Sequence, residues 1–202
     1  MRIGVLASGE GSNLQAILDT VHGAEADVVA VGSDKPEARA LQRAAAAGVP
    51  TRVFEARAYP DRHARDVAMA DWLEEAAIDL VVLAGYMQIL DPAFLARFPQ
   101  RVINVHPTLL PAFPGIASVQ QAVDYGVKVI GVTVHFVDEG VDTGAIIAQR
   151  AIPMPEGADA AAALAALRPL EHALLPEVVR LIARGAVRVD PANPRRVQVS
   201  AP

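Results

Sequence analysis

Short apolar runs alternate with amphipathic segments along the first half of the chain. Short runs rich in apolar residues predict strands over residues 3–7, 28–31, 51–54, 80–84 and 102–106. The runs 3–7 and 80–84 are apolar throughout, which is typical of strands buried on both faces. Apolar residues at helical spacing predict helices between them, starting at Asn13 with a C-cap at Gly23, and over residues 36–47 and 62–75. This alternation predicts an α/β fold, with a mostly parallel sheet, helices on both faces and ligands beyond the carboxyl ends of the strands.

The second half has a different pattern. Two runs at 129–137 and 145–152 predict an antiparallel pair of strands joined by the loop 138–144, so the sheet is expected to be mixed. Residues 159–184 predict a helix, in which Pro169 and Pro176 are expected to end, start or kink a segment. The 202 residues then form one domain over 1–188 and a tail over 189–202, with a short strand packed before the end frays.

Composition and charge narrow the classes of function that the chain can have. Hydrophobic residues make up 52% of the chain and aromatic residues 4%, which favours a globular core built from aliphatic side chains. The net charge of −5 argues against a nucleic-acid partner. The chain has no cysteine, which excludes disulfides, zinc thiolate sites and thiol nucleophiles. No apolar run approaches the ~20 residues of a membrane helix and the opening run is too short for a signal peptide, so a cytoplasmic protein without membrane contact is expected.

A glycine-rich turn, residues 8–13, separates the first strand from the first helix. Backbone N–H groups and the positive end of a helix converge there, which favours a bound phosphate. Ser12 and Asn13 add side-chain donors or a helix cap. The alternative is a tight turn with an N-cap and no ligand. The segment lacks the Gly-Lys-Ser/Thr of an ATP-binding loop, and the dinucleotide pattern of glycines fails at Leu14, so a monophosphate is favoured.

Polar residues lie at the end of the strand 102–106. Asn104 and His106 are two residues apart and therefore project from the same face. An amide beside an imidazole suits an oxyanion and a leaving amine; the alternative is a polar strand end with satisfied hydrogen bonds. His135 has no evident partner in the sequence and is interpreted as structural. His22, His63 and His172 are not candidates for catalysis, and no spacing of His, Asp or Glu predicts a metal site.

Asp138, Glu139 and Asp142 cluster in the loop between the two antiparallel strands. Acids in such a loop commonly form turns through hydrogen bonds to the backbone. The functional alternative is that one of them faces His106, where a carboxylate would favour the protonated imidazole and prepare a general acid.

Five ordered motifs, taken together, resemble one family. The segments 8–16, 82–87, 104–111, 134–144 and 171–172 are similar to the folate-dependent glycinamide ribonucleotide formyltransferase family of purine synthesis, over residues 3–188. The resemblance implies a Rossmann-like formyltransferase fold. It also implies that the amine of glycinamide ribonucleotide attacks the formyl group of 10-formyltetrahydrofolate, with no metal. The two small molecules would be the partners of a monomer or homodimer.

The resemblance also implies residue roles. Asn104 and His106 would stabilise the oxyanion, with His106 as proton donor and Asp142 favouring its protonated form. The ribonucleotide would be bound by Gly11, Ser12, Asn13, Arg168, Pro169, Leu170 and Glu171. The folate would be bound by Arg62, Met87, Gln88, Ile89, Leu90, Asn104, Asp138, Glu139, Gly140, Val141 and Asp142.

Three positions depart from the family pattern. Gln88 stands where the family often has arginine, and Thr108 replaces the usual serine but keeps the hydroxyl. The segment 116–118 lacks a histidine that the family often carries after the residue matching Gly115. The contacts that would depend on the arginine and the histidine are therefore open.

Other functions remain alternatives. Methionyl-tRNA formyltransferase would add a C-terminal nucleic-acid-binding domain, and formyltetrahydrofolate hydrolase an N-terminal regulatory domain; neither is expected in a chain of this length and charge. Another amine acceptor would keep the same reaction type. A non-catalytic nucleotide-sensing module on the same fold is the alternative from a different class, because fold does not imply function.

Overall fold

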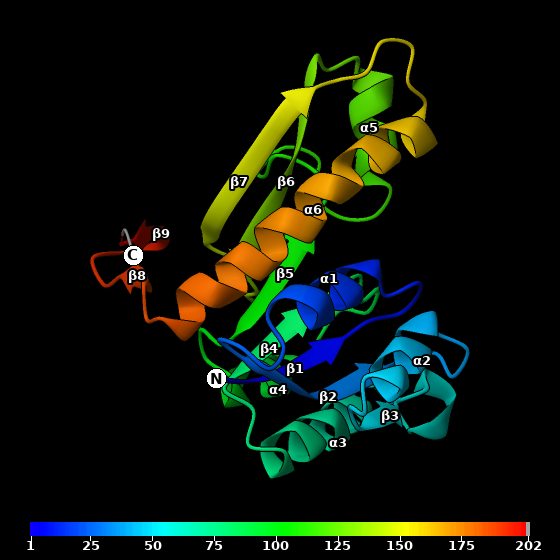
Figure 1. The fold of residues 1–202 in the computed structure, drawn as a ribbon, viewed down its shortest axis with the longest axis vertical. Coiled ribbons are helices and arrows are strands. Elements are labelled where there is room, and N and C mark those ends of the chain that lie inside the picture. Colours follow the sequence, from blue (N-terminus) through cyan, green and yellow to red (C-terminus); the bar gives the residue numbers. More distant parts are fainter. Residues whose placement is uncertain (201–202) are drawn as a thin grey trace. The chain divides into compact units, whose positions relative to one another are not determined.

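The computed structural model describes residues 1–200, which divide into two compact units. The first comprises Met1–Asn104 and the second begins at Val105. The strands follow the order β3-β2-β1-β4-β5-β6-β7 in a seven-stranded sheet, and β8 and β9 form a separate pair (Figure 1). The expected mostly parallel α/β fold with a mixed second half is confirmed.

The first unit alternates strands and helices. Its elements are β1 (Arg2–Leu6), α1 (Ser12–Thr20), β2 (Asp27–Ser33), α2 (Arg39–Ala46), β3 (Thr51–Val53), the 3₁₀ turn η1 (Ala56–Ala58), α3 (Arg62–Glu75), β4 (Leu80–Leu83) and α4 (Pro92–Arg97). The strand β5 (Val102–His106) begins in this unit and ends in the second. The helix predicted over 62–75 and the strand predicted over 102–106 match their observed bounds.

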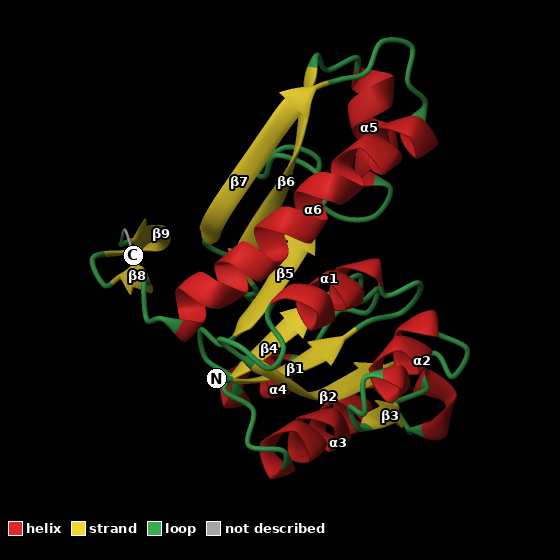
Figure 2. Cartoon of the chain, in the orientation of Figure 1, coloured by secondary structure: helices red, strands yellow, loops and turns green. Residues whose placement is uncertain are grey.

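The direction of the chain across the first unit's sheet reverses at β1. The chain runs outward from β1 through β2 to β3 and then returns to β4 on the other side of β1, all in parallel pairs. Because parallel crossovers are right-handed, α1 and α2 cover one face and α3 the other, as Figure 2 shows for α1 and α3. The reversal creates a switch point beyond the carboxyl ends of β1 and β4, where α/β folds bind ligands.

The second unit is built on an antiparallel pair. Its elements are α5 (Ser118–Tyr125), β6 (Val129–Phe136), β7 (Ile146–Pro153), α6 (Ala160–Ala183), β8 (Val187–Asp190) and β9 (Asn193–Val199). The strands β6 and β7 pair over almost their full lengths, and α6 packs along both of them. Leu167, Leu174, Val178 and other apolar side chains of α6 are fully buried in that contact.

Two features of the second half differ from the expectations. The helix α6 is one continuous element with both Pro169 and Pro176 inside it, so neither proline ends or starts a helix, because burial of its apolar face outweighs the backbone hydrogen bonds that the two prolines remove. The predicted tail also contains more structure than one short strand. Its strands β8 and β9 form an antiparallel hairpin, and β9 contacts β7.

Across residues 1–200, none of the helices combines the length and the apolar character that a membrane crossing requires.

Candidate active site

Two of the predicted ligand-binding segments meet at the switch point of the first unit. Ser8, which follows β1, donates its backbone N–H to the carbonyl of Gly85 at 3.0 Å. Its hydroxyl accepts a hydrogen bond from the Met87 N–H at 2.8 Å. The loop after β1 and the loop after β4 are therefore joined by a residue that is 5% exposed. The candidate phosphate loop and the candidate folate segment 87–90 lie side by side.

The candidate phosphate loop depends on Gly11. This residue caps α1 with a φ of 68°, a left-handed conformation that favours glycine. A Cβ atom there would lie 2.6 Å from the Cα of Ala40 in α2. The helix has no side-chain cap, so of the two roles expected of Ser12 and Asn13 the helix cap is not observed and the role of side-chain donor stays a prediction. The first turn of α1 also carries no acidic residue, which leaves its positive end available for an anion.

The segment 87–90 presents two apolar side chains. Met87 is 67% exposed and Ile89 is 58% exposed, whereas Leu90 is buried. Gln88, between the two exposed residues, donates from Nε2 to Asp34 Oδ2 at 2.9 Å. Exposed apolar side chains on an anchored backbone are suited to contact a flat ring system.

Arg62 lies at the start of α3, close to this segment. Its Nε is 4.0 Å from Asp91 Oδ2, and its side chain is 50% exposed. Asp91 caps α4 by accepting the Ala93 N–H, and this bond, followed by that from His63, lowers its pKa. The imidazole of His63 lies 3.1 Å from the same carboxylate, which agrees with a structural role for that histidine.

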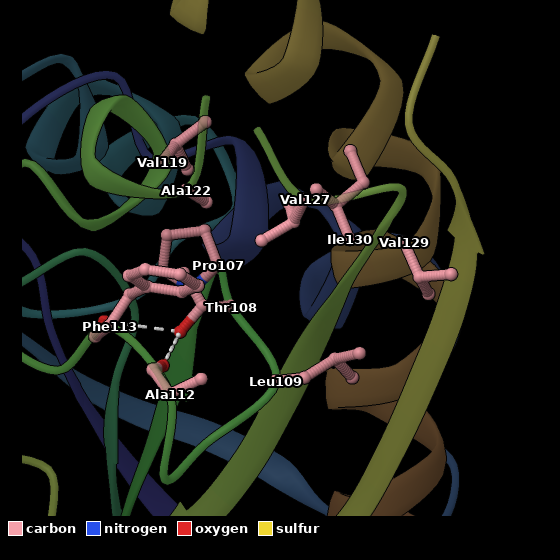
Figure 3. Close-up of a pocket in the computed structure, with 10 residues that line it drawn as sticks. All are labelled: Pro107, Thr108, Leu109, Ala112, Phe113, Val119, Ala122, Val127, Val129 and Ile130. Carbon is pink, nitrogen blue, oxygen red and sulfur yellow. Dashed lines mark hydrogen bonds between the residues drawn. The ribbon is translucent and has the colours of Figure 1, made fainter. Parts of the chain in front are cut away.

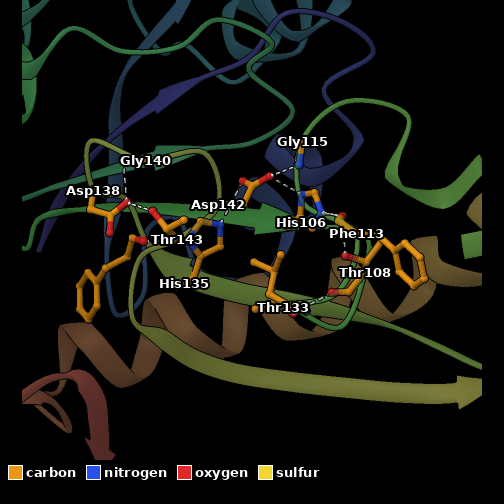
Figure 4. Close-up of polar contacts among 12 residues, drawn as sticks. His106, Thr108, Phe113, Gly115, Thr133, His135, Asp138, Gly140, Asp142 and Thr143 are labelled. Atoms are coloured by element: carbon orange, nitrogen blue, oxygen red, sulfur yellow. Dashed lines mark hydrogen bonds and ion pairs between the residues drawn. The ribbon is translucent and has the colours of Figure 1, made fainter. Parts of the chain in front are cut away.

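His106, at the end of β5, is held between two acceptors. Its Nδ1 lies 3.3 Å from Asp142 Oδ2, and its Nε2 lies 3.0 Å from the carbonyl oxygen of Phe113, as Figure 4 shows. A carboxylate and a carbonyl can only accept hydrogen bonds, so an imidazole with N–H groups on both nitrogens satisfies both of them. The two acceptors therefore fix the orientation of the ring between them. Asn104 precedes His106 by two positions on the same strand.

Several groups contact the carboxylate of Asp142 and fix its position. Gly115 donates its backbone N–H to Oδ2 at 2.8 Å, and His135 Nε2 lies 3.6 Å from Oδ1. Burial alone would raise the pKa of Asp142. The contact with His135, the Gly115 N–H and the positive charges of His106 and His135 outweigh burial and lower the pKa to about 2. Asp142 is therefore a carboxylate at neutral pH.

His135 has the partner that the sequence did not reveal. Besides its contact with Asp142, its Nδ1 lies 2.7 Å from the carbonyl oxygen of Phe136, and its side chain is 2% exposed. The expectation that nothing nearby would supply a partner is wrong, because residues 138–142 turn the chain back toward β6 after that strand ends. His135 supports Asp142 from the side opposite to His106 (Figure 4).

The rest of the acidic loop forms a turn. Asp138 Oδ1 accepts hydrogen bonds from the Gly140 N–H at 3.1 Å and from the Thr143 hydroxyl at 2.6 Å. Glu139 and Val141 are exposed. The turn-forming role and the functional role considered for these acids therefore belong to different residues. Asp138 stabilises the turn, and Asp142 faces His106.

An apolar cavity lies beneath the loop that follows β5, and the sequence analysis did not identify it. It has a volume of about 140 Å³ and lies between that loop, α5 and the start of β6 (Figure 3). Thr108 closes one side by donating its hydroxyl to the carbonyls of Ala112, at 2.8 Å, and Phe113, at 3.2 Å. The Phe113 carbonyl is the one that contacts His106, so the hydroxyl that Thr108 retains helps to place this acceptor.

The remaining candidates for ribonucleotide binding lie on α6. Glu171 is 8% exposed, whereas Arg168 and Pro169 are exposed and Leu170 is half-buried. The neighbouring His172 has a buried Nε2 without a hydrogen-bond partner, and its pKa is lowered by burial and by the charge of Arg168. Within residues 1–200, no group of three or more His, Asp or Glu side chains is arranged to hold a metal ion.

The fold, the switch-point loops and the supported histidine define a member of a known enzyme family. The chain belongs to the formyl transferase family, whose sequence profile matches residues 1–179. It is 47% identical over 189 residues to a phosphoribosylglycinamide formyltransferase of Mycobacterium tuberculosis, an alignment that covers 93% of this chain and 87% of that protein.

Other similar proteins have names that agree with this family. A phosphoribosylglycinamide formyltransferase of Bacillus subtilis is 40% identical, with 89% of this chain and 93% of that protein covered. The crystal structure of glycinamide ribonucleotide transformylase 1 from Symbiobacterium toebii superposes with a TM-score of 0.94 at 45% identity, covering 98% of this chain and 93% of that one. The chain also matches the trifunctional purine biosynthetic protein adenosine-3 of Drosophila pseudoobscura pseudoobscura at 42% identity, but it spans 14% of that protein's length.

Proposed function

We propose that this enzyme transfers the formyl group of 10-formyltetrahydrofolate to the amine of glycinamide ribonucleotide in purine biosynthesis. The products are formylglycinamide ribonucleotide and tetrahydrofolate. The observation that carries the proposal is His106, held between the Asp142 carboxylate and the Phe113 carbonyl in a protein of the formyl transferase family. The names of the relatives support the ribonucleotide as the acceptor.

The ribonucleotide phosphate would bind at the N-terminus of α1. The left-handed Gly11 opens the helix without a side-chain cap, and no acidic residue lies in its first turn. Ser12 and Asn13 would supply further donors. Arg168, Pro169, Leu170 and Glu171, on α6, would contact the glycinamide end, where a carboxylate suits an amine.

The folate would bind against the segment 87–90. Met87 and Ile89 would pack on its ring system, Gln88 and Leu90 would complete the wall, and Arg62 would meet an anionic group at the rim. Asn104 and the loop residues Asp138, Glu139, Gly140, Val141 and Asp142 would contact it as well.

The reaction would pass through a tetrahedral intermediate. The amine nitrogen forms a bond to the formyl carbon, and the carbonyl oxygen becomes an oxyanion stabilised by the Asn104 amide and the His106 imidazolium. The bond from the formyl carbon to the folate nitrogen then breaks. That nitrogen receives a proton donated by His106, and the proton that the attacking amine loses is relayed through water to His106, which restores its donor. Because the Phe113 carbonyl accepts from His106 Nε2 in the structure, a substrate group that uses this proton must displace that carbonyl.

An absorbance assay for the folate product tests the proposal. Purified protein is mixed with 10-formyltetrahydrofolate, with and without glycinamide ribonucleotide. Turnover that requires the ribonucleotide is the expected result. Turnover without it would identify a hydrolase, and no turnover in either mixture would favour another amine acceptor or a nucleotide-binding module.

The His106→Ala variant tests the assigned residue. Loss of a preorganised oxyanion donor typically lowers the rate by about 10²–10³, and the loss of a proton donor adds to this. His63→Ala is the matched control, since His63 is also an imidazole beside an aspartate but is assigned no role in the reaction. Equal activities of the two variants would contradict the assignment.

A further inference from the structure

A buried arginine on α3 is not used by the proposed mechanism. Arg65 is 2% exposed and lies beside Asp66, which is fully buried. Its Nε donates to Asp66 Oδ1 at 2.8 Å, and its Nη1 donates to Gln88 Oε1 at 3.3 Å. The guanidinium therefore connects the body of α3 to the middle of the segment 87–90.

Gln88 also contacts a second carboxylate, on the side away from Arg65. Its Nε2 donates to Oδ2 of Asp34, which follows β2 and is 9% exposed. The chain Asp66–Arg65–Gln88–Asp34 thus places one cation between two carboxylates, and both carboxylates favour the charged form of Arg65. In this arrangement Gln88 uses both ends of its amide, so its orientation is fixed.

The same stretch of α3 also fixes the end of the segment. Asp66 Oδ2 accepts the Asp91 backbone N–H at 2.7 Å. Neighbouring residues of α3 therefore anchor the loop after β4 at Gln88 and at Asp91, while Ser8 anchors it at Met87. Of the two exposed apolar side chains of the segment, Met87 belongs to an anchored residue, and Ile89 lies between the anchors at Gln88 and Asp91.

This arrangement is costly for stability. The Nη2 of Arg65 and the Oδ1 of Asp34 are buried without a hydrogen-bond partner. Buried ion pairs are often no more stabilising than apolar side chains of the same volume, and unsatisfied polar atoms add to the cost. An apolar contact between α3 and the loop would hold the fold at lower cost, but it would not fix the loop at a directional bond.

We propose that Arg65 is a positioning residue for the folate, acting through Gln88 to hold the segment 87–90 in its binding geometry. The proposal rests on the proposed function, because that function makes the segment 87–90 a wall of the folate site.

An exchange of the two side chains tests the proposal. Arg65→Gln removes the cation from between Asp34 and Asp66, and Gln88→Arg places a second guanidinium against Arg65. We expect each single variant to raise KM for 10-formyltetrahydrofolate about tenfold, a coupling typical of residues in one network. For Arg65→Gln we also expect kcat and KM for the ribonucleotide to stay within about twofold. The double variant, Arg65→Gln with Gln88→Arg, retains one guanidinium and one amide and is expected to recover most of the loss.

Arg97→Gln is the matched control. Arg97 joins α4 to Asp71 and Glu74 of α3 without touching the segment 87–90. We expect this variant to lower Tm without changing KM for the folate. If Arg65→Gln does not yield folded protein, Arg65→Lys keeps the charge, loses the forked geometry and is measured in its place.

Hydrogen exchange tests the role of Arg65 independently of the proposed formyl transfer. We expect the amides of residues 87–91 to exchange faster in Arg65→Gln than in the wild type, while those of α1 are unchanged. Wild-type protein without formyl transfer would refute the proposed function, and the exchange rates would still decide whether Arg65 positions the loop. Unchanged exchange at 87–91, an unchanged KM for the folate in Arg65→Gln, or a double variant that loses the sum of both single effects would each overturn the inference.

Discussion

Asp142→Asn is expected to destabilise the fold by an amount that depends on pH. The substitution keeps the shape of the side chain and removes a charge that is 14% exposed and faces two imidazoles and one backbone N–H. The pKa of Asp142 is about 2, below the ordinary 3.8. Because a shift of one pKa unit corresponds to about 1.36 kcal/mol, the ionised carboxylate contributes about 2 kcal/mol to the free energy of unfolding at neutral pH.

The sign of the pH dependence follows from the lowered pKa. A group with a lower pKa in the folded state stabilises that state above its unfolded pKa, and this contribution is lost as the pH falls through the folded pKa. The difference between wild type and Asp142→Asn is therefore expected to be about 2 kcal/mol at pH 7, about half of that at pH 3, and near zero below pH 2. Urea denaturation followed by far-UV circular dichroism at each pH measures it.

Glu139→Gln is the control for this measurement. Glu139 lies in the same loop and is exposed, so its loss is expected to change the free energy of unfolding by less than about 0.5 kcal/mol. A loss for Asp142→Asn that is equal at pH 7 and pH 3 would refute the electrostatic reasoning. A loss at pH 7 no larger than that of Glu139→Gln would show that the contacts of Asp142 do not stabilise the fold.

Three further substitutions probe other parts of the structure by urea denaturation. Gly11→Ala is expected to cost about 2 kcal/mol or more, because φ is 68° and the added Cβ meets the Ala40 backbone, whereas Gly9→Ala, which meets nothing within 4 Å, should be nearly neutral. Thr133→Val is expected to cost about 2–3 kcal/mol, since its fully buried hydroxyl serves three partners, and Thr133→Ser should recover most of this. Pro169→Ala is expected to stabilise α6 by about 1–3 kcal/mol, and a destabilised variant would show that the exposed proline has a favourable contact.

Much of the first unit follows from apolar runs and helical spacing. The helix Arg62–Glu75 and the strand Val102–His106 match the prediction because strong patterns mark both ends. The helix Pro92–Arg97 was missed because six residues are too few for a periodic signal. Its start was nevertheless present in the sequence, since Asp91 is a side-chain cap and Pro92 occupies the first turn.

Some features of the predicted site also follow from local sequence patterns, whereas others depend on the tertiary structure. The pairing of Asn104 with His106 is local and follows from strand alternation, but the approach of Asp142 to His106 depends on how residues 107–141 fold. No local pattern indicates that His135 and Gly115 hold that carboxylate. The same is true of Arg65, because an arginine on a helix is normally solvated and only the packed structure shows it buried.

The two prolines inside α6 have a consequence for the order of folding. Each removes a backbone hydrogen bond and costs about 3 kcal/mol relative to alanine in a helix interior, so the isolated 24-residue segment will be poorly helical. The helix therefore depends on the β6–β7 hairpin, whose contacts are local in sequence, to provide the surface on which it forms. Destabilising substitutions within α6 should consequently speed unfolding and leave the folding rate almost unchanged, which places this helix late on the folding pathway.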